Sequence, residues 1–197
     1  MDIYEIKGHT LEYLDSIHCY VVDGVILPSI TKILGLKFKD KYKNVKKEVL
    51  NKAAKRGTEV HNAIENYCKN GTESELRELK NFKFLKKQYK FEVLDNEIPI
   101  IIFDDRGKPI ATGRLDLVLK DGEEIGLGDI KRTSVLDKEY LTYQLNLYRI
   151  GYQQCYGTEI KFLKGLHLRN EVRKYIDIPI NEKAAKELLN EYFKKNN

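Results

Sequence analysis

Several features that would assign this chain to common classes are missing. No stretch is apolar over the roughly eighteen residues that a membrane-spanning helix needs, and the first residues lack a basic-then-apolar signal pattern. Cysteine is scarce and scattered, at Cys19, Cys68 and Cys155, which gives neither zinc-ligand pairs nor the four ligands of an iron–sulfur cluster. Repeats, linkers and low-complexity segments are absent too. We therefore expect one cytoplasmic domain over residues 1–197, without a cysteine-bound metal.

Negative charge is almost lacking in one segment. Residues 37–56 hold nine basic residues and two acidic ones, so this segment carries +7 while the net charge of the chain is only +5, which leaves −2 elsewhere. Phe38 and Tyr42 interleave with the lysines. Such asymmetry indicates a polyanionic partner, with a solvated helix face as the alternative.

The segment from Gly113 to Lys131 has the pattern of a β-hairpin with charged residues. Leucines at 115, 117 and 119 alternate with Asp116, Val118 and Lys120, which is the periodicity of a strand. Asp121-Gly122 is a favoured two-residue hairpin turn. With that turn, Asp129 is expected opposite Arg114, and Asp116 opposite Leu127.

This hairpin would present Asp116, Asp129 and Lys131 on one face, because strand side chains alternate with period two. Diagonal neighbours lie roughly 7–8 Å apart, so the two carboxylates can share a divalent cation. The carbonyl of Ile130 would add an oxygen ligand, and Lys131 would orient or polarise a water molecule. Such a constellation suits phosphodiester hydrolysis.

The three-residue pattern of an acid, any residue and a lysine is not specific by itself. It also occurs at Glu5-Lys7, Glu78-Lys80 and Glu159-Lys161. Only Asp129-Lys131 follows a strand with an Asp on the matching face and leads into a helix that carries Gln144 and Tyr148 one turn apart.

The rest of the chain alternates strand and helix patterns. We expect a hairpin over 9–27, with β-prone Ile17 and a turn at Asp23-Gly24. A first helix should start at Pro28-Ser29, a second should cover 40–55 and break at Gly57, and a third should run from Thr58 to about Asn70; further helices are expected over 73–90, 137–155 and 182–195. Strands are expected over 91–103, 159–168 and 172–178.

Some candidate residues allow two interpretations. His61 lies at the edge of an apolar helix face and is either packed there or a ligand, if that helix covers the hairpin. Glu97 is either a solvated residue at a strand start or a further acid near the metal site. Gln144 and Tyr148 either bind the substrate or form a partly buried polar edge.

In order and spacing, these residues resemble the PD-(D/E)xK nucleases, in particular the RecB-like and phage recombination exonuclease branch. The resemblance covers most of the chain and rests on Pro28–Leu34, Arg56–His61, Glu97, Gly113–Asp116, Asp129–Lys131 and Gln144–Tyr148. Two positions depart from the family pattern. Leu115 replaces a proline, and Arg132 separates Lys131 from Thr133.

The resemblance implies an α/β fold with a restriction-endonuclease-like core, a central mixed sheet flanked by helices. It implies a Mg²⁺- or Mn²⁺-dependent DNA exonuclease of recombination, repair or phage DNA processing, in a bacterial or phage-infected cell. The metal ligands would be Asp116, Asp129, the Ile130 carbonyl, His61 and Glu97.

In the same resemblance, Lys131 assists the attacking water, while Gln144 and Tyr148 hold the DNA strand or the catalytic helix. One metal with Lys131, or two metals, would serve. DNA contacts are expected from Lys43, Lys46, Lys47, Arg56 and Arg132. Further expected partners are a single-strand annealing protein or a second copy of the chain. The alternatives are a structure-dependent endonuclease and a non-catalytic DNA-end-binding module.

Overall fold

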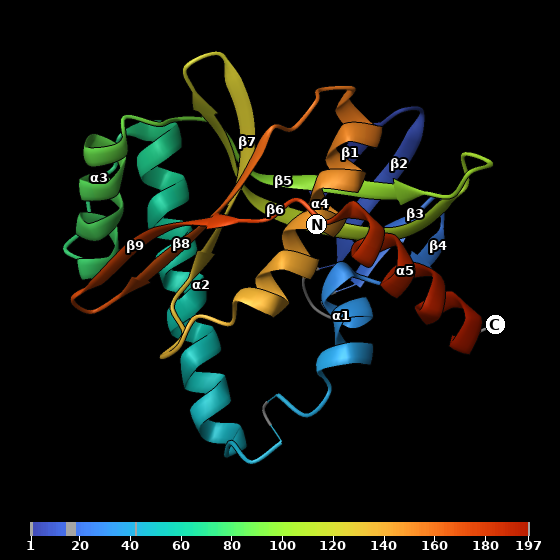
Figure 1. Cartoon of the computed structure of the whole chain (residues 1–197), viewed down its shortest axis with the longest axis horizontal. Helices are drawn as coiled ribbons and strands as arrows, with labels where there is room; N and C mark the ends of the chain where they lie inside the picture. Colours follow the sequence, from blue (N-terminus) through green and yellow to red (C-terminus); the bar gives the residue numbers. More distant parts are fainter. Residues whose placement is uncertain (1, 15–18, 42, 197) are drawn as a thin grey trace.

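The computed structural model describes residues 2–14, 19–41 and 43–196 (Figure 1). Its elements are, in chain order, β1 (Asp2–Ile6), β2 (His9–Leu14), β3 (Cys19–Val22), β4 (Val25–Leu27), α1 (Ile30–Phe38), α2 (Lys47–Asn70), α3 (Arg77–Tyr89), β5 (Glu92–Phe103), β6 (Pro109–Asp121), β7 (Glu124–Lys131), α4 (Lys138–Tyr156), β8 (Phe162–Arg169), β9 (Val172–Ile178) and α5 (Glu182–Asn196).

A mixed five-stranded sheet lies at the centre, in the order β5-β6-β7-β8-β9. Strands β7 and β8 run parallel and are joined through α4, whereas the other neighbours pair antiparallel. The expected α/β fold with a mixed sheet flanked by helices is thus confirmed, and it is compatible with a restriction-endonuclease-like core.

Helices cover the sheet from two sides and form two hydrophobic cores (Figure 1). On one side, α1, α4 and α5 pack together, with Leu141 of α4 over Gly165 of β8, and with Gly151 and Cys155 further along α4 against Ile100 and Ile101 of β5. On the other side, Phe82 of α3 and Ile64 of α2 pack against Leu117 of β6. The central strands are therefore buried on both faces, which explains their long apolar runs.

The opening of the chain is more strand-rich than predicted. Strands β1–β4 form a separate antiparallel four-stranded sheet, of which the sequence predicted only the part within 9–27. The predicted turn at Asp23-Gly24 is confirmed between β3 and β4. Ile17 and Tyr42, which entered the sequence predictions, lie outside the described residues.

Two helix predictions around the basic segment were wrong. Residues 40, 41 and 43–46 are not helical, and α2 begins only at Lys47. It then continues through Gly57, because glycine lowers helix stability by only about 1 kcal/mol, which packing of the helix outweighs. Thr58 does not cap a new helix; its hydroxyl donates to the Ala54 carbonyl one turn earlier. Ser29 does cap α1 as expected, accepting from the Lys32 amide.

Candidate metal centre

Three carboxylates lie on neighbouring strands of the central sheet. Glu97 of β5 falls between two ladder pairs whose β6 members flank Asp116. The ladder between β6 and β7 ends at the pair Leu117–Gly128, and the next position sets Asp116 opposite Asp129. The row Glu97–Asp116–Asp129 therefore crosses three strands at one level.

The predicted turn of the β6–β7 hairpin was wrong. Asp121 pairs with Glu124, so the two-residue loop is Gly122-Glu123 rather than Asp121-Gly122. Gly122 has a φ of 58°, whereas Glu123 is not in the left-handed region. Glycine at the first loop position fits a type II′ turn, while an Asp-Gly loop of type I′ needs positive φ at both positions.

As a result, the predicted register was off by two residues. Asp129 was expected opposite Arg114, and Asp116 opposite Leu127, but the two aspartates oppose each other. A shift by an even number of residues leaves every side chain on its predicted face. The two aspartates are therefore direct neighbours across the strands, whereas the predicted register made them diagonal neighbours.

Glu97 reaches this row through an unusual backbone. Its φ is 53°, in the left-handed region that residues with a side chain rarely adopt. Its Oε1 lies 3.3 Å from Nδ1 of His61, and its Oε2 lies 3.9 Å from Nε of Arg114. The side chain is 18% exposed, so Glu97 belongs to the cluster and is not a solvated strand-start residue. Strain of this kind concentrates at functional sites.

His61 extends from α2 over the carboxylates. Its Nδ1 lies 3.6 Å from Oδ1 of Asp116. One ligand atom from each of His61, Glu97 and Asp116 lies within 4.8 Å of the others, and this group can hold a metal ion. Burial opposes protonation of the imidazole, but the charges of Asp116, Glu97 and Asp129 outweigh it and raise the pKa of His61 to about 9.

Asp129 is the least satisfied acid of the centre. It is 1% exposed, and among the described residues no donor reaches its Oδ1. The Lys131 ammonium contacts its Oδ2. Burial, together with the nearby charge of Asp116, raises the pKa of Asp129 to about 6 even though Lys131 acts in the opposite direction. Buried carboxylate oxygens without donors are suited to a cation.

Asp116 and Lys131 are held in place by neighbours on β7. The backbone amide of Ile130 donates to Oδ2 of Asp116 at 2.6 Å, which fixes that carboxylate against the strand. Burial raises the pKa of Asp116, while His61 and Lys131 limit this rise. The pKa of Lys131 is raised despite its burial, because Asp129 and Asp116 stabilise the ammonium.

Gln144 lines a cavity next to the carboxylates. The cavity measures about 310 Å³, and Lys131, Thr133 and Tyr140 also line it. Gln144 is only 7% exposed, and its Oε1 has no hydrogen-bond partner among the described residues. An unpaired amide that faces a cavity beside Lys131 supports the interpretation of Gln144 as a binding residue.

Tyr148, one turn further along α4, is buried and faces the sheet. It is 5% exposed, and a Cβ placed on Gly113 would lie only 2.8 Å from its Cε1. Glycine at position 113 thus lets α4 approach β6 closely. Of the two roles that the resemblance implies for Tyr148, holding the DNA strand or holding the catalytic helix, the structure favours the second.

Two arginines predicted to contact DNA are engaged within the protein. Arg56 of α2 and Arg132, which follows β7, both bind the carboxylate of Glu78 on α3. Arg56 also lies 3.1 Å from Glu59. Their guanidinium groups are thus internal partners of a buried acid, and their contact with DNA stays a prediction.

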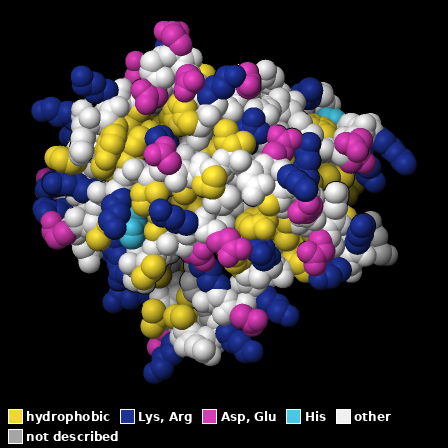
Figure 2. All heavy atoms as spheres, viewed as in Figure 1, with side chains coloured by type: hydrophobic (Ala, Val, Ile, Leu, Met, Phe, Trp, Pro, Cys, Tyr) yellow, Lys and Arg dark blue, Asp and Glu magenta, His cyan; other side chains and the backbone are white. Residues whose placement is uncertain are grey.

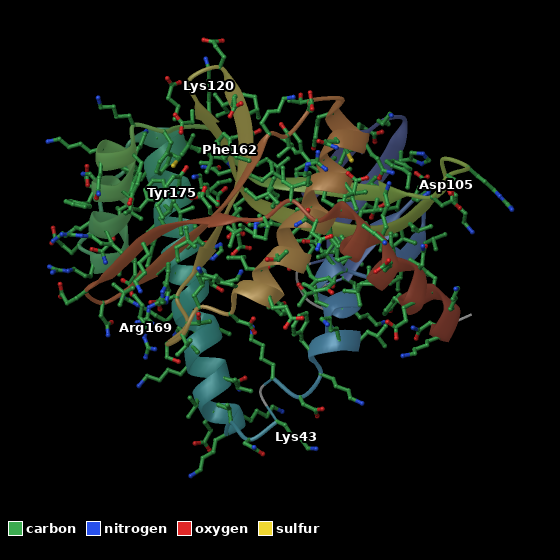
Figure 3. The ribbon with its side chains drawn as sticks, in the orientation of Figure 1. Lys43, Asp105, Lys120, Phe162, Arg169 and Tyr175 are labelled. Atoms are coloured by element: carbon green, nitrogen blue, oxygen red, sulfur yellow. The ribbon has the colours of Figure 1, made fainter. Side chains whose placement is uncertain are left out.

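The three lysines predicted to contact DNA lie at the start of α2 and before it. Lys46 precedes the first residue of the helix, Lys47, and both are exposed. Lys43 extends from the connection between α1 and α2, at the foot of the molecule in Figure 3. Its ammonium lies 3.8 Å from Asp40, an exposed pair that leaves it accessible.

Sequence reasoning missed two charged residues of this region. Arg114 was part of the motif, but its role was not predicted; it lies 3.0 Å from Oδ2 of Asp2 and supports Glu97. Glu78 was dismissed as a chance match. Its arginine partners are 22 and 54 residues away in the chain, so no local pattern could have revealed it.

The chain matches no family model and no curated protein sequence. Its structure is similar to a solved structure described as "Crystal structure of SSO0001", with 15% sequence identity and a TM-score of 0.49. The match covers 86% of this chain and 76% of that chain. In the described part of the chain, no helix is both long and apolar enough to cross a bilayer.

Proposed function

We propose that this protein is a divalent-metal-dependent deoxyribonuclease of the PD-(D/E)xK type, acting as an exonuclease. One observation carries the proposal: Glu97, Asp116 and Asp129 stand opposite one another on three strands, with His61 above them and Lys131 in contact with Asp129. Acids and a lysine grouped in this way suit hydrolysis of a phosphodiester.

The donor set fits a hard divalent cation. Asp116 and Glu97 would hold it together with His61, whose proton the cation would displace, and Asp129 would provide a further ligand. Carboxylate oxygens dominate, which favours Mg²⁺ or Mn²⁺ over copper or zinc. When bound, such an ion acts as a Lewis acid on the phosphate and lowers the pKa of a water ligand.

Lys131 would contribute the fixed positive charge of the site. Its ammonium is held by Asp129, and its raised pKa keeps it protonated near neutral pH. A preorganised charge beside the scissile phosphate stabilises the negative charge that develops in the transition state. Gln144, which lines the adjoining cavity and has an unpaired amide oxygen, would position the strand.

The basic segment would supply contacts to the DNA backbone. Lys43, Lys46 and Lys47 are exposed near the start of α2, the helix that also carries His61. Phosphate contacts position DNA without reading its sequence. Replacing the three lysines by glutamine should therefore weaken binding to all sequences alike. Each lost contact should reduce the slope of log K against log salt by about 0.7–0.9, which fluorescence anisotropy at several salt concentrations measures.

A nuclease that binds the DNA backbone regardless of sequence needs another limit on which DNA it cleaves. We propose that this protein requires a free DNA end. Supercoiled plasmid and its linearised form, incubated with the protein and Mg²⁺ or Mn²⁺, should differ: the linear form is degraded and the closed circle persists. EDTA should stop the reaction. Nicking of the circle at a comparable rate would favour the endonuclease alternative. Binding without cleavage under every metal condition would favour the non-catalytic module.

A further inference from the structure

A second basic surface lies over α3, and the proposed metal centre does not use it. It surrounds a shallow hollow of about 650 Å³ whose lining includes Lys80, Lys83, Lys86, Lys87 and Lys90, and no acidic residue. In Figure 2, Lys and Arg side chains gather at the left edge of the molecule, over α3 and the β8–β9 hairpin. We call this the α3 surface.

The positive charge of the α3 surface is only partly neutralised. Residues 77–90 contain six basic residues and one acid, Glu78, which is buried on the inner side of the helix. Exposed Glu75 and Glu73 pair with Lys80 and Lys83. Among the described residues, no carboxylate lies within ion-pair distance of the other three lysines. Such a field attracts a polyanion.

Aromatic rings lie among these charges. The Lys83 ammonium lies 5.2 Å from the centre of the Tyr67 ring, which lines the hollow. Phe84 is 42% exposed, and the guanidinium of Arg173 from β9 lies 3.6 Å from the centre of its ring. Planar rings and guanidinium groups beside lysines are the usual means of holding unpaired bases and their backbone together.

The α3 surface lies close to the metal centre along one helix. His61 and Tyr67 both belong to α2, six residues apart, which corresponds to about 9 Å along the helix axis at 1.5 Å per residue. Six residues also turn the helix by about 240°, so the two side chains leave α2 on different sides, and a strand bound at both sites would pass around this helix.

We propose that the α3 surface binds single-stranded DNA. The lysines would contact the phosphates, and the exposed ring of Phe84 would contact bases. The role of this site rests on the proposed nuclease function, in which the α3 surface would hold a single strand next to the metal centre. Binding itself requires neither metal nor cleavage. An acidic protein segment would match the charges but not the rings.

Binding without cleavage tests this proposal directly. Fluorescein-labelled oligothymidylates, from about 4 to about 16 nucleotides and longer, cover the usual site sizes of single-strand binding surfaces. Their affinity is measured by anisotropy in EDTA at several salt concentrations. The variant carries Lys83→Gln, Lys86→Gln and Lys87→Gln. A matched control carries Lys183→Gln, Lys194→Gln and Lys195→Gln on α5, at the opposite edge of the molecule (Figure 1).

The α3 variant should lose about 0.7 per contact, or about 2 in total, from the slope of log K against log salt. The control variant should keep the slope of the unmodified protein. Equal slopes in all three proteins would overturn the proposal, as would an equal loss in both variants.

Phe84→Leu tests the contribution of the ring. It should weaken binding of single strands about tenfold and leave binding of duplex DNA of equal length unchanged. An equal loss for both substrates, or competition by polyglutamate as effective as by single-stranded DNA, would overturn the single-strand assignment. Because EDTA is present throughout, this binding result does not depend on cleavage. A lack of cleavage in the separate plasmid assay with Mg²⁺ or Mn²⁺ would contradict the proposed function and leave the binding result intact.

Discussion

Asp129 and Glu78 are both 1% exposed, yet their surroundings are opposite. Glu78 binds two arginines, which hold its pKa below the usual value although burial alone would raise it. Asp129 contacts the Lys131 ammonium through Oδ2 but has no donor to Oδ1 among the described residues. It faces a second acid, and its pKa is raised to about 6.

The comparison shows two uses of a buried charge. The carboxylate of Glu78 joins α3 to α2 and to the segment after β7, so it stabilises the fold. The Lys131 ammonium offsets the charge of Asp129 only in part, since the pKa of Asp129 stays raised. Without a metal ion, Asp129 therefore opposes the stability of the fold. Regions built for function keep such unsatisfied groups, while structural regions satisfy them.

The largest effect is expected for Lys131→Ala. Loss of a preorganised charge should lower cleavage about 10²–10³-fold, with DNA binding nearly unchanged. Single-turnover assays with labelled linear DNA measure the rate, and circular dichroism checks the fold. Lys120→Ala in the same hairpin serves as the control. Undiminished cleavage by the Lys131 variant would remove Lys131 from the site.

The next largest effect is expected for stability in Glu78→Gln. Removing one partner of a buried ion-pair network costs about 3 kcal/mol or more. Because its folded pKa is lowered, Glu78 contributes stability that is present above its ordinary pKa of 4.5 and is lost as pH falls through the folded pKa. Urea unfolding should therefore show a larger loss at pH 7 than at pH 4. Exposed Glu75→Gln, measured in parallel, should change little.

Metal should stabilise the protein through the centre. At a free Mg²⁺ or Mn²⁺ concentration of about 100 times Kd, the free energy of unfolding should rise by about 2.7 kcal/mol. Thermal unfolding with metal and with EDTA measures the difference. Asp116→Asn should abolish this gain, whereas Glu78→Gln should retain it. A gain of equal size in the Asp116 variant would place the cation elsewhere.

The smallest effect, opposite in sign, is expected for Asp129→Asn without metal. Its folded pKa of about 6 exceeds the ordinary value of 3.8, so ionisation destabilises the fold as pH rises through this window. The substitution should stabilise the protein by about 1 kcal/mol at pH 7 and less at pH 4. If the Asp129 variant is instead less stable in urea unfolding, the attraction between Asp129 and Lys131 outweighs the cost of burying the carboxylate. Asp129 would then stabilise the fold, as Glu78 does.

Much of the fold follows from local patterns in the sequence. Period-two alternation marked β6 and β7, and the 3.6-residue period marked α4 and α5, because side-chain burial on one face is a local property. The same alternation placed Asp116, Asp129 and Lys131 on one face. The residues of the candidate centre could therefore be named from the sequence.

The tertiary structure decided how these residues meet. The register depended on the Gly122-Glu123 loop, and the approach of His61 depended on how α2 packs over the sheet. The left-handed backbone of Glu97 is held by its surroundings and has no sequence signal. The pairing of Glu78 with Arg56 and Arg132 joins distant segments. Such contacts form only when separate elements pack together, and no local pattern determines them.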